Sequence, residues 1–193
     1  MLMNFEDLGA YKRGRVWLNE YPHRPYRSKG RVDQSFPLKS YTYHAHCALT
    51  IELVLAARMV SNYANIGVSY FPSDNGVLVV QAEIGFDDDL IVDDVIALQP
   101  DVIKCGIPEE YIHAVIDEIQ KLSADPDVLL PSGRIVIDTG AHGLVGSSPV
   151  SFRQAINVLL QLLTLEDKTA ESVQDKIVDV LHRVNQLAKD SIL

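Results

Sequence analysis

Hydrophobic and polar positions alternate in short segments between residues 66 and 140, and this period of two is typical of β-strands. The strands it predicts are IGVSYF (66–71), VLVVQAEIGF (77–86), LIVDDVIALQ (90–99) and RIVIDTG (134–140). The first two are joined by PSDNG, where Asn75 and Gly76 tolerate the positive φ of a tight turn. Shorter strands are predicted earlier, in RVWLNEY and around YTYHAH.

Apolar residues that recur every three or four positions predict four helices. The first is predicted over residues 46–64, a segment rich in Ala and Leu. The other three are predicted over 107–122, 151–163 and 169–188. From residue 66 the order is strand, strand, strand, helix, strand, helix. This order predicts an α+β fold, a two-layer sandwich in which helices cover one face of a mostly antiparallel four-stranded sheet.

The helix predicted over 107–122 has the clearest boundaries. Gly106 ends the preceding segment, and Pro108 suits the first turn because its missing N–H would have had no partner there. An apolar stripe should face the sheet while the acids face water. The stripe comprises Ile112, Val115 and Ile119, and the acids are Glu109, Glu110 and Asp117. The two glutamates also place negative charge at the positive end of the helix dipole.

The segment GIPEEYIHAV (106–115) resembles the start of a helix in the fourth domain of translation elongation factor G. Further matches follow in the family's order: IVID (135–138), His142, VGSS (145–148) and Phe152. The resemblance covers residues 66–165, about half of the chain. It departs from the family at Gly146, where the family has Asp, and the spacing from His142 to Ser147 is one residue longer.

The resemblance implies a fold of the ribosomal protein S5 domain 2-like type, whose parallel crossover is left-handed. The chain contains no G-x-x-x-x-G-K-[ST] segment, so a GTPase domain is not expected. We therefore interpret the chain as a free-standing relative of the fourth domain. Residues 1–65 would add an arm and a helix to a core at 66–165, and residues 166–193 would add a C-terminal helix.

In that family the tip of this domain reaches RNA in the ribosome, so the resemblance implies a non-enzymatic binding protein. The implied partners are the ribosome or structured RNA, and no catalytic residue, cofactor or metal is expected. The candidate RNA contacts are His142, Ser147, Ser148, Arg24, Arg27 and Arg31.

Composition narrows the class of protein. With 193 residues, 47% of them hydrophobic, the chain should bury a substantial core. No apolar run reaches the roughly 18–20 residues that cross a bilayer, and the N-terminus does not resemble a signal peptide. Two cysteines, Cys47 and Cys105, do not form a disulfide framework and are expected to be small buried groups. These features favour a cytoplasmic protein without membrane contact.

The net charge of −9 is unevenly distributed. Residues 1–46 carry eight basic and four acidic side chains, whereas the remainder carries nine basic and 22 acidic ones. The basic, tyrosine-rich segment could therefore bind nucleic acid, or it could dock on the acidic body of its own chain. Both interpretations fit the sequence.

Two rival functions also fit particular residues. One is a metal-dependent enzyme built around His44 and His46, which would share a metal if they lay on a strand, with Glu52, Asp138 or His142 completing the site. At the predicted helix start they would instead have ordinary packing or capping roles. A homo-oligomer is the other alternative, because the apolar stripe of helix 169–188 needs a cover. Helix 46–64 of the same chain or a second copy of the chain would provide it.

Two polar segments have simpler interpretations. Ser147 and Ser148, followed by Pro149, favour a helix cap over a catalytic serine, and the same helix start could contact a phosphate. The acidic runs at 87–89 and 93–94 lack the oxygen spacing of a calcium loop and are typical of solvated loops.

Overall fold

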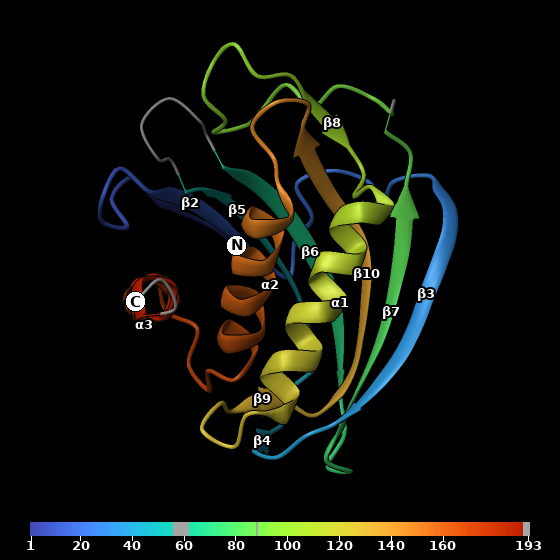
Figure 1. Cartoon of the computed structure of the whole chain (residues 1–193), viewed down its shortest axis with the longest axis vertical. Coiled ribbons are helices and arrows are strands. Elements are labelled where there is room, and N and C mark those ends of the chain that lie inside the picture. Colours follow the sequence, from blue (N-terminus) through green and yellow to red (C-terminus); the bar gives the residue numbers. More distant parts are fainter. Residues whose placement is uncertain (56–61, 88, 191–193) are drawn as a thin grey trace.

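The computed structural model describes residues 1–55, 62–87 and 89–190. These residues form an eight-stranded sheet, a two-stranded ribbon and three helices (Figure 1). The large sheet contains β1 (Leu2–Phe5), β2 (Arg13–Leu18), β3 (Ser28–Pro37), β5 (Cys47–Val54), β6 (Tyr63–Pro72), β7 (Val77–Gly85), β8 (Ile103–Cys105) and β10 (Gly133–Gly143). The ribbon pairs β4 (Tyr41–Thr42) with β9 (Leu130–Pro131). The helices are α1 (Glu109–Ala124), α2 (Pro149–Leu163) and α3 (Ala170–Asp190).

The strand order is β1-β2-β5-β6-β10-β7-β3, and β8 extends the sheet beside the end of β10. Every neighbouring pair in this sheet is antiparallel except β10 and β7. The predicted α+β class and mostly antiparallel pairing are therefore confirmed. The predicted number of four strands is wrong, because β1, β2, β3 and β5 from the N-terminal third join the same sheet as the predicted core.

The helix predicted over residues 46–64 is also wrong. Cys47–Val54 is strand β5, Tyr63 begins β6, and residues 56–61 lie outside the described part of the chain. Every residue of β5 is buried, because helices cover one face of this strand and loops cover the other. Leu49, Ile51 and Leu53 face the main core and alternate with Thr50 and Glu52 on the far face. The apolar run at residues 53–57 follows this alternation directly, so the segment also fits a helical spacing.

The third strand predicted at residues 90–99 is replaced by a loop, with a single bridge between Ile91 and Lys104. The strand of this region is β8, which follows the loop and pairs with β10. We call residues 89–102 the cover loop. Its apolar side chains, from Val92 to Leu98, pack on a small second core made of Val54, Tyr63, Ile103 and Ala141. Burial of these side chains, rather than strand pairing, explains the apolar character of the segment.

The parallel neighbours β7 and β10 are connected through α1. Figure 1 shows α1 in front of the sheet, with β10 to the left of β7 and both strands running upward. In Figure 1 the chain leaves β7 at the top, returns through α1 in front of the sheet and enters β10 to the left of β7. A crossover with this path is left-handed, whereas roughly 98% of crossovers between parallel strands are right-handed. The crossover brings the end of β7, the start of α1 and the end of β10 together at one end of the molecule.

The helix starts follow the sequence rules closely. Gly106 has φ +99°, a conformation that favours glycine, and Pro108 caps α1 directly before Glu109. The predicted stripe of Ile112, Val115 and Ile119 is completely buried, and the three predicted acids are exposed. In α2, the Ser148 side chain accepts a hydrogen bond from the Ser151 backbone N–H, so the predicted cap is confirmed.

The C-terminal helix α3 packs against α2. Its apolar stripe is buried in the main hydrophobic core, which also holds Met3 and Phe5 of β1. The stripe residues are Val173, Ile177, Val180 and Leu181. The chain therefore covers this stripe itself, although not with the helix 46–64 that the sequence had predicted. None of the helices in the described ranges has both the length and the hydropathy of a membrane span.

The buried stripe of α1 makes a direct test of this packing. Ile119→Ala should lower the free energy of unfolding by ~2–5 kcal/mol, because the side chain is fully buried between α1 and the sheet. Glu109→Ala should lower it by at most ~1 kcal/mol, since the exposed carboxylate contributes mainly through the helix dipole. Denaturant titrations would measure both values, and equal small losses would contradict the structure.

Candidate functional site

The segment between β2 and β3, residues 19–27, crosses the face of the sheet that α1 and α2 leave uncovered. We call it the crossing segment, and we call that side of the sheet the far face. Two tyrosines fasten the segment: the Tyr21 hydroxyl lies 2.8 Å from Ser69 Oγ, and the Tyr26 hydroxyl donates to the Glu83 carbonyl (2.7 Å). This part of the basic, tyrosine-rich region therefore docks on its own chain, one of the two alternatives left by the sequence.

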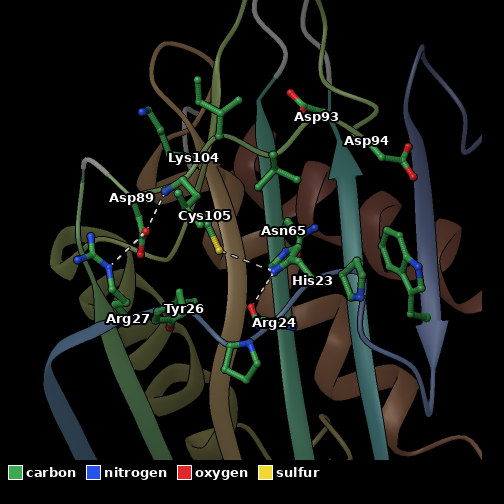
Figure 2. Close-up of a pocket in the computed structure, with 16 residues that line it drawn as sticks. His23, Arg24, Tyr26, Arg27, Asn65, Asp89, Asp93, Asp94, Lys104 and Cys105 are labelled. Atoms are coloured by element: carbon green, nitrogen blue, oxygen red, sulfur yellow. Dashed lines mark hydrogen bonds and ion pairs between the residues drawn. The ribbon is translucent and has the colours of Figure 1, made fainter.

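A cavity of about 1090 Å³ opens on the far face between the crossing segment and the cover loop (Figure 2). Trp17 and Asn65 line it from β2 and β6, and Cys105 lines it from β8. Residues 22–27 and 89–94 form the remaining walls. The cavity therefore combines a sheet floor with two irregular walls, and we treat it as the candidate functional site.

Strand register places a row of side chains beneath and beside this cavity. Arg15 pairs with Glu52, Glu52 with Asn65, Asn65 with Ala141, and Ala141 with Cys105. Because directly paired residues project to the same side of a sheet, the five side chains cross the far face in one line. They come from five strands, spread between residues 15 and 141, and only the sheet brings them together.

Glu52 is completely buried within this row. Its Oε1 accepts hydrogen bonds from the Tyr63 hydroxyl (2.9 Å) and from the Ile96 backbone N–H (3.1 Å). Arg15 Nη1 lies 3.8 Å from Glu52 Oε2 and 2.8 Å from Asp94 Oδ1. Burial raises the pKa of Glu52, and these partners oppose the rise only in part. The cluster attaches the cover loop to the sheet.

Several buried polar atoms at the site have no hydrogen-bond partner among the described residues. They are Asn65 Oδ1, His23 Nε2, Thr50 Oγ1 and Glu52 Oε2. Asn65 is only 2% exposed and lines the cavity. An unmet buried acceptor costs free energy, and in native proteins it is normally satisfied by water or by a ligand. The cavity therefore offers an acceptor suited to a hydrogen-bond donor.

His23 and Cys105 face each other across the cavity wall (Figure 2). Cys105 Sγ lies 3.8 Å from His23 Nδ1, which also lies 3.3 Å from the Arg24 carbonyl oxygen. Burial lowers the pKa of His23. Burial and the nearby Asp89 carboxylate raise the pKa of the Cys105 thiol. Cys47 is buried as predicted, whereas the prediction for Cys105 is wrong, because this thiol is half-buried and lines a cavity.

The residues predicted from the family resemblance lie at the end of β10 and the start of α2. His142 is 4% exposed, and its Nδ1 lies 2.8 Å from the Gly106 carbonyl oxygen. Ser147 Oγ donates to the Tyr63 carbonyl (2.7 Å) and accepts from the Gly143 N–H (2.8 Å). Ser148 caps α2. These side chains thus hydrogen-bond to backbone groups around the end of β10 and the start of α2. His142 also lines a smaller hollow of about 350 Å³.

The predicted arginines lie elsewhere. Arg24 and Arg27 line the far-face cavity, and Arg27 Nε lies 3.5 Å from Asp89 Oδ1. Arg31 lies on edge strand β3, paired with Asp33 at 2.8 Å. The six predicted contact residues therefore fall into three groups. The end of the molecule that carries His142 also carries many acids: Asp87, Asp89, Asp93, Asp94, Asp101, Glu109 and Glu110.

His44 and His46 have separate environments. His44 Nε2 lies 3.0 Å from the Thr164 carbonyl oxygen, and the His46 ring packs on Phe71 with centroids 4.8 Å apart. Neither lies in a helix, since residues 43–46 precede β5. Across the ranges 1–55, 62–87 and 89–190, no three His, Cys, Asp or Glu side chains gather at a common metal position.

Comparison of the chain with protein-family models, with curated proteins and with solved structures finds no match. Apart from Arg24 and Arg27, the residues of the far-face cavity were not predicted from the sequence as a site. His23 sits in the proline-rich stretch YPHRPY, which indicates a fixed extended segment, but no periodicity identifies its neighbours. Asn65 and Cys105 meet His23 only through the sheet register and the path of the crossing segment.

The buried Glu52 predicts a measurable dependence of stability on pH. Because its pKa is raised in the folded state, the folded chain holds this proton more tightly than the unfolded chain, and stability falls as the pH rises above the ordinary value of 4.5. Glu52→Gln removes this loss and keeps an oxygen for Tyr63 and Ile96. The stability of the variant relative to the wild type should therefore increase as the pH rises above 4.5, by about 1.4 kcal/mol per unit of pKa shift, and level off once the pH passes the raised pKa of folded Glu52.

Denaturant titrations across this pH range would measure the difference. Glu6→Gln, whose side chain is exposed and lies outside the helices, is the matched control and should follow the wild type. A Glu52→Gln curve parallel to the wild-type curve would show that Glu52 does not titrate as its burial indicates.

Proposed function

We propose that this protein is a binding protein that takes a small organic ligand in the far-face cavity. The observation that carries the proposal is the buried side chain of Asn65, a residue that lines the cavity and whose Oδ1 has no hydrogen-bond partner among the described residues. A ligand with an N–H or O–H donor would satisfy this atom. The neighbouring His23 Nε2 is a second buried atom that a ligand or a shift of the ring would satisfy.

The rest of the lining suits an apolar ligand body. Trp17, Tyr26 and two prolines contribute flat or rigid surfaces. Leu90 is 77% exposed and Ile91 59% exposed at the rim, so a bound ligand would remove apolar surface from water. The volume suits a ligand at or above the usual size of a drug molecule. Apolar walls with a few converging polar atoms are the usual composition of a small-molecule site.

Trp17 provides the test because it is the sole tryptophan of the sequence and lines the cavity. Ligand-observed NMR with small aromatic amides, alcohols and esters should find binders, and these should change the Trp17 emission on titration. Asn65→Leu keeps the side-chain size and removes the acceptor. It should weaken donor-bearing binders about three- to tenfold, the usual contribution of one hydrogen bond.

Gln154→Leu, on α2 at the opposite face of the sheet, is the matched control and should leave binding unchanged. Two results would refute the proposal. One is a library in which no compound changes the Trp17 emission, and the other is unchanged affinity of every binder in Asn65→Leu.

We propose binding to the ribosome or structured RNA as a second candidate function. The left-handed β7–α1–β10 crossover favours it, because the family that GIPEEYIHAV resembles has this uncommon connection. Arg24 and Arg31 are exposed on the far-face side and on edge strand β3. The acids around His142 weigh against phosphate contacts at that end, so the arginines would supply them.

Filter binding to ribosomes and to total RNA at several salt concentrations tests this second candidate. Arg24→Ala and Arg31→Ala should each lower the dependence of the logarithm of affinity on the logarithm of salt concentration by about one unit. Arg183→Ala on α3 is the control, because this arginine pairs with Asp179 within the helix. Absence of binding at the lowest salt concentration would refute this function.

A further inference from the structure

We infer that Cys105 is a nucleophile that accepts an acyl group from an activated ester or thioester bound in the far-face cavity, with His23 as its general base. This inference rests on the proposed ligand site and assigns a chemistry to it. A nucleophile and a base within hydrogen-bond reach, with a third group to orient the base, is the arrangement that nucleophilic catalysis requires.

The position of Cys105 makes it the candidate nucleophile. Cys105 ends β8, is half-buried and lines the cavity, so a ligand in the cavity can reach its sulfur. The 3.8 Å between Cys105 Sγ and His23 Nδ1 is within range of a hydrogen bond to sulfur. Cys47, the other cysteine, is buried in the main core. The two thiols therefore differ in both access and partner.

The tautomer of His23 decides whether it can act as the base. In the contact with the Arg24 carbonyl, Nδ1 is the donor, so to accept the thiol proton the ring must give up that hydrogen bond and carry its proton at Nε2 instead. Nε2 is buried without a partner among the described residues, as is Oδ1 of Asn65, and Figure 2 shows the Asn65 side chain beside the His23 ring. The two atoms do not hydrogen-bond to each other in this structure, and a shift of the ring would bring Nε2–H to one lone pair of Asn65 Oδ1 while the other lone pair accepts from the ligand. We place Asn65 as the positioning residue on this ground.

Acyl transfer at this site balances in atoms and protons. As the sulfur attacks the carbonyl carbon, an S–C bond forms, the thiol proton moves to His23 Nδ1, and the bond to the leaving oxygen or sulfur breaks. The proton then passes from His23 to the leaving group. While it is protonated, His23 can donate from Nδ1 to the Arg24 carbonyl, 3.3 Å away, and from Nε2 toward Asn65. The site thus holds acceptors for both N–H groups of the imidazolium.

At rest, the pair is uncharged. Burial keeps His23 neutral, and burial together with Asp89 keeps the proton on Cys105. The pair therefore rests as a thiol and a neutral imidazole, and proton transfer accompanies attack. Asp89 is the charged group that acts on Cys105, and Arg27 pairs with Asp89. Tyr26 lies near Cys105, and Asp138 and Glu83 act on Tyr26. The rate of acylation should follow the neutral fraction of His23.

The experiment uses p-nitrophenyl acetate and the full-length chain. The wild type should release nitrophenolate and gain one acetyl group, which peptide mass spectrometry should locate on Cys105. The rate should rise with pH through a value below 6.5, the ordinary pKa of histidine, and then level off until the thiol ionises without the base. His23→Gln should slow acetylation roughly a hundredfold or more and abolish this rise, because general-base catalysis is lost.

Cys105→Ala should abolish acetylation, and Cys47→Ala is the matched control that should retain it. His23→Asn provides a second test if His23→Gln fails to fold. Equal acetylation of Cys47, or a wild-type rate that rises with pH only as a free thiol ionises, would overturn the inference. Ligand binding reported by Trp17 without acetylation would overturn the chemistry alone, whereas absence of any binding would overturn the proposed ligand site as well.

Discussion

The structure depends on one constraint: the central strands of the sheet are buried on both faces, with apolar side chains toward the helices and a mixture of polar and apolar ones on the far face, so both faces must be covered. β5 is buried along its whole length, and β6 is buried over most of its length. The helices α1, α2 and α3 cover one face with regular packing. The far face is covered by two irregular segments, the crossing segment and the cover loop, which have their own backbone groups to satisfy. Irregular cover leaves space, and that space is the cavity.

Polar groups on the far face are what hold this cover in place. Glu52 connects the sheet to the cover loop through the Ile96 N–H, and Arg15 connects it through Asp94. A buried carboxylate is costly unless its oxygens are paired, so the loop and the sheet depend on each other. The same row leaves Asn65 Oδ1 unpaired at the cavity floor among the described residues. Glu52 and Arg15, which attach the cover loop, and Asn65, which offers an acceptor to a ligand, thus belong to the same row of side chains across the sheet.

Features set by neighbouring residues could be predicted from the sequence, whereas features set by tertiary contacts could not. The helix stripe of α1 and the serine cap of α2 depend on residues within one or two helical turns, and both were predicted correctly. Strand β5 was mistaken for a helix because the apolar residues 53–57, which follow its short alternation of Leu, Thr, Ile, Glu and Leu, also fit a helical spacing. The predicted contact residues Ser147 and Ser148 proved to be engaged with neighbouring backbone groups, which a sequence pattern does not show.

The sequence by itself determined the α+β class, the three helices after residue 106 and the strand Gly133–Gly143, because each of these follows from local periodicity and capping. The tertiary structure alone decided that residues 1–55 supply strands to the same sheet as the rest of the chain. It also decided the meeting of His23, Asn65 and Cys105, which come from a loop and two strands far apart in the chain. Their proximity depends on sheet register and on the crossing segment, and neither is encoded by a local pattern.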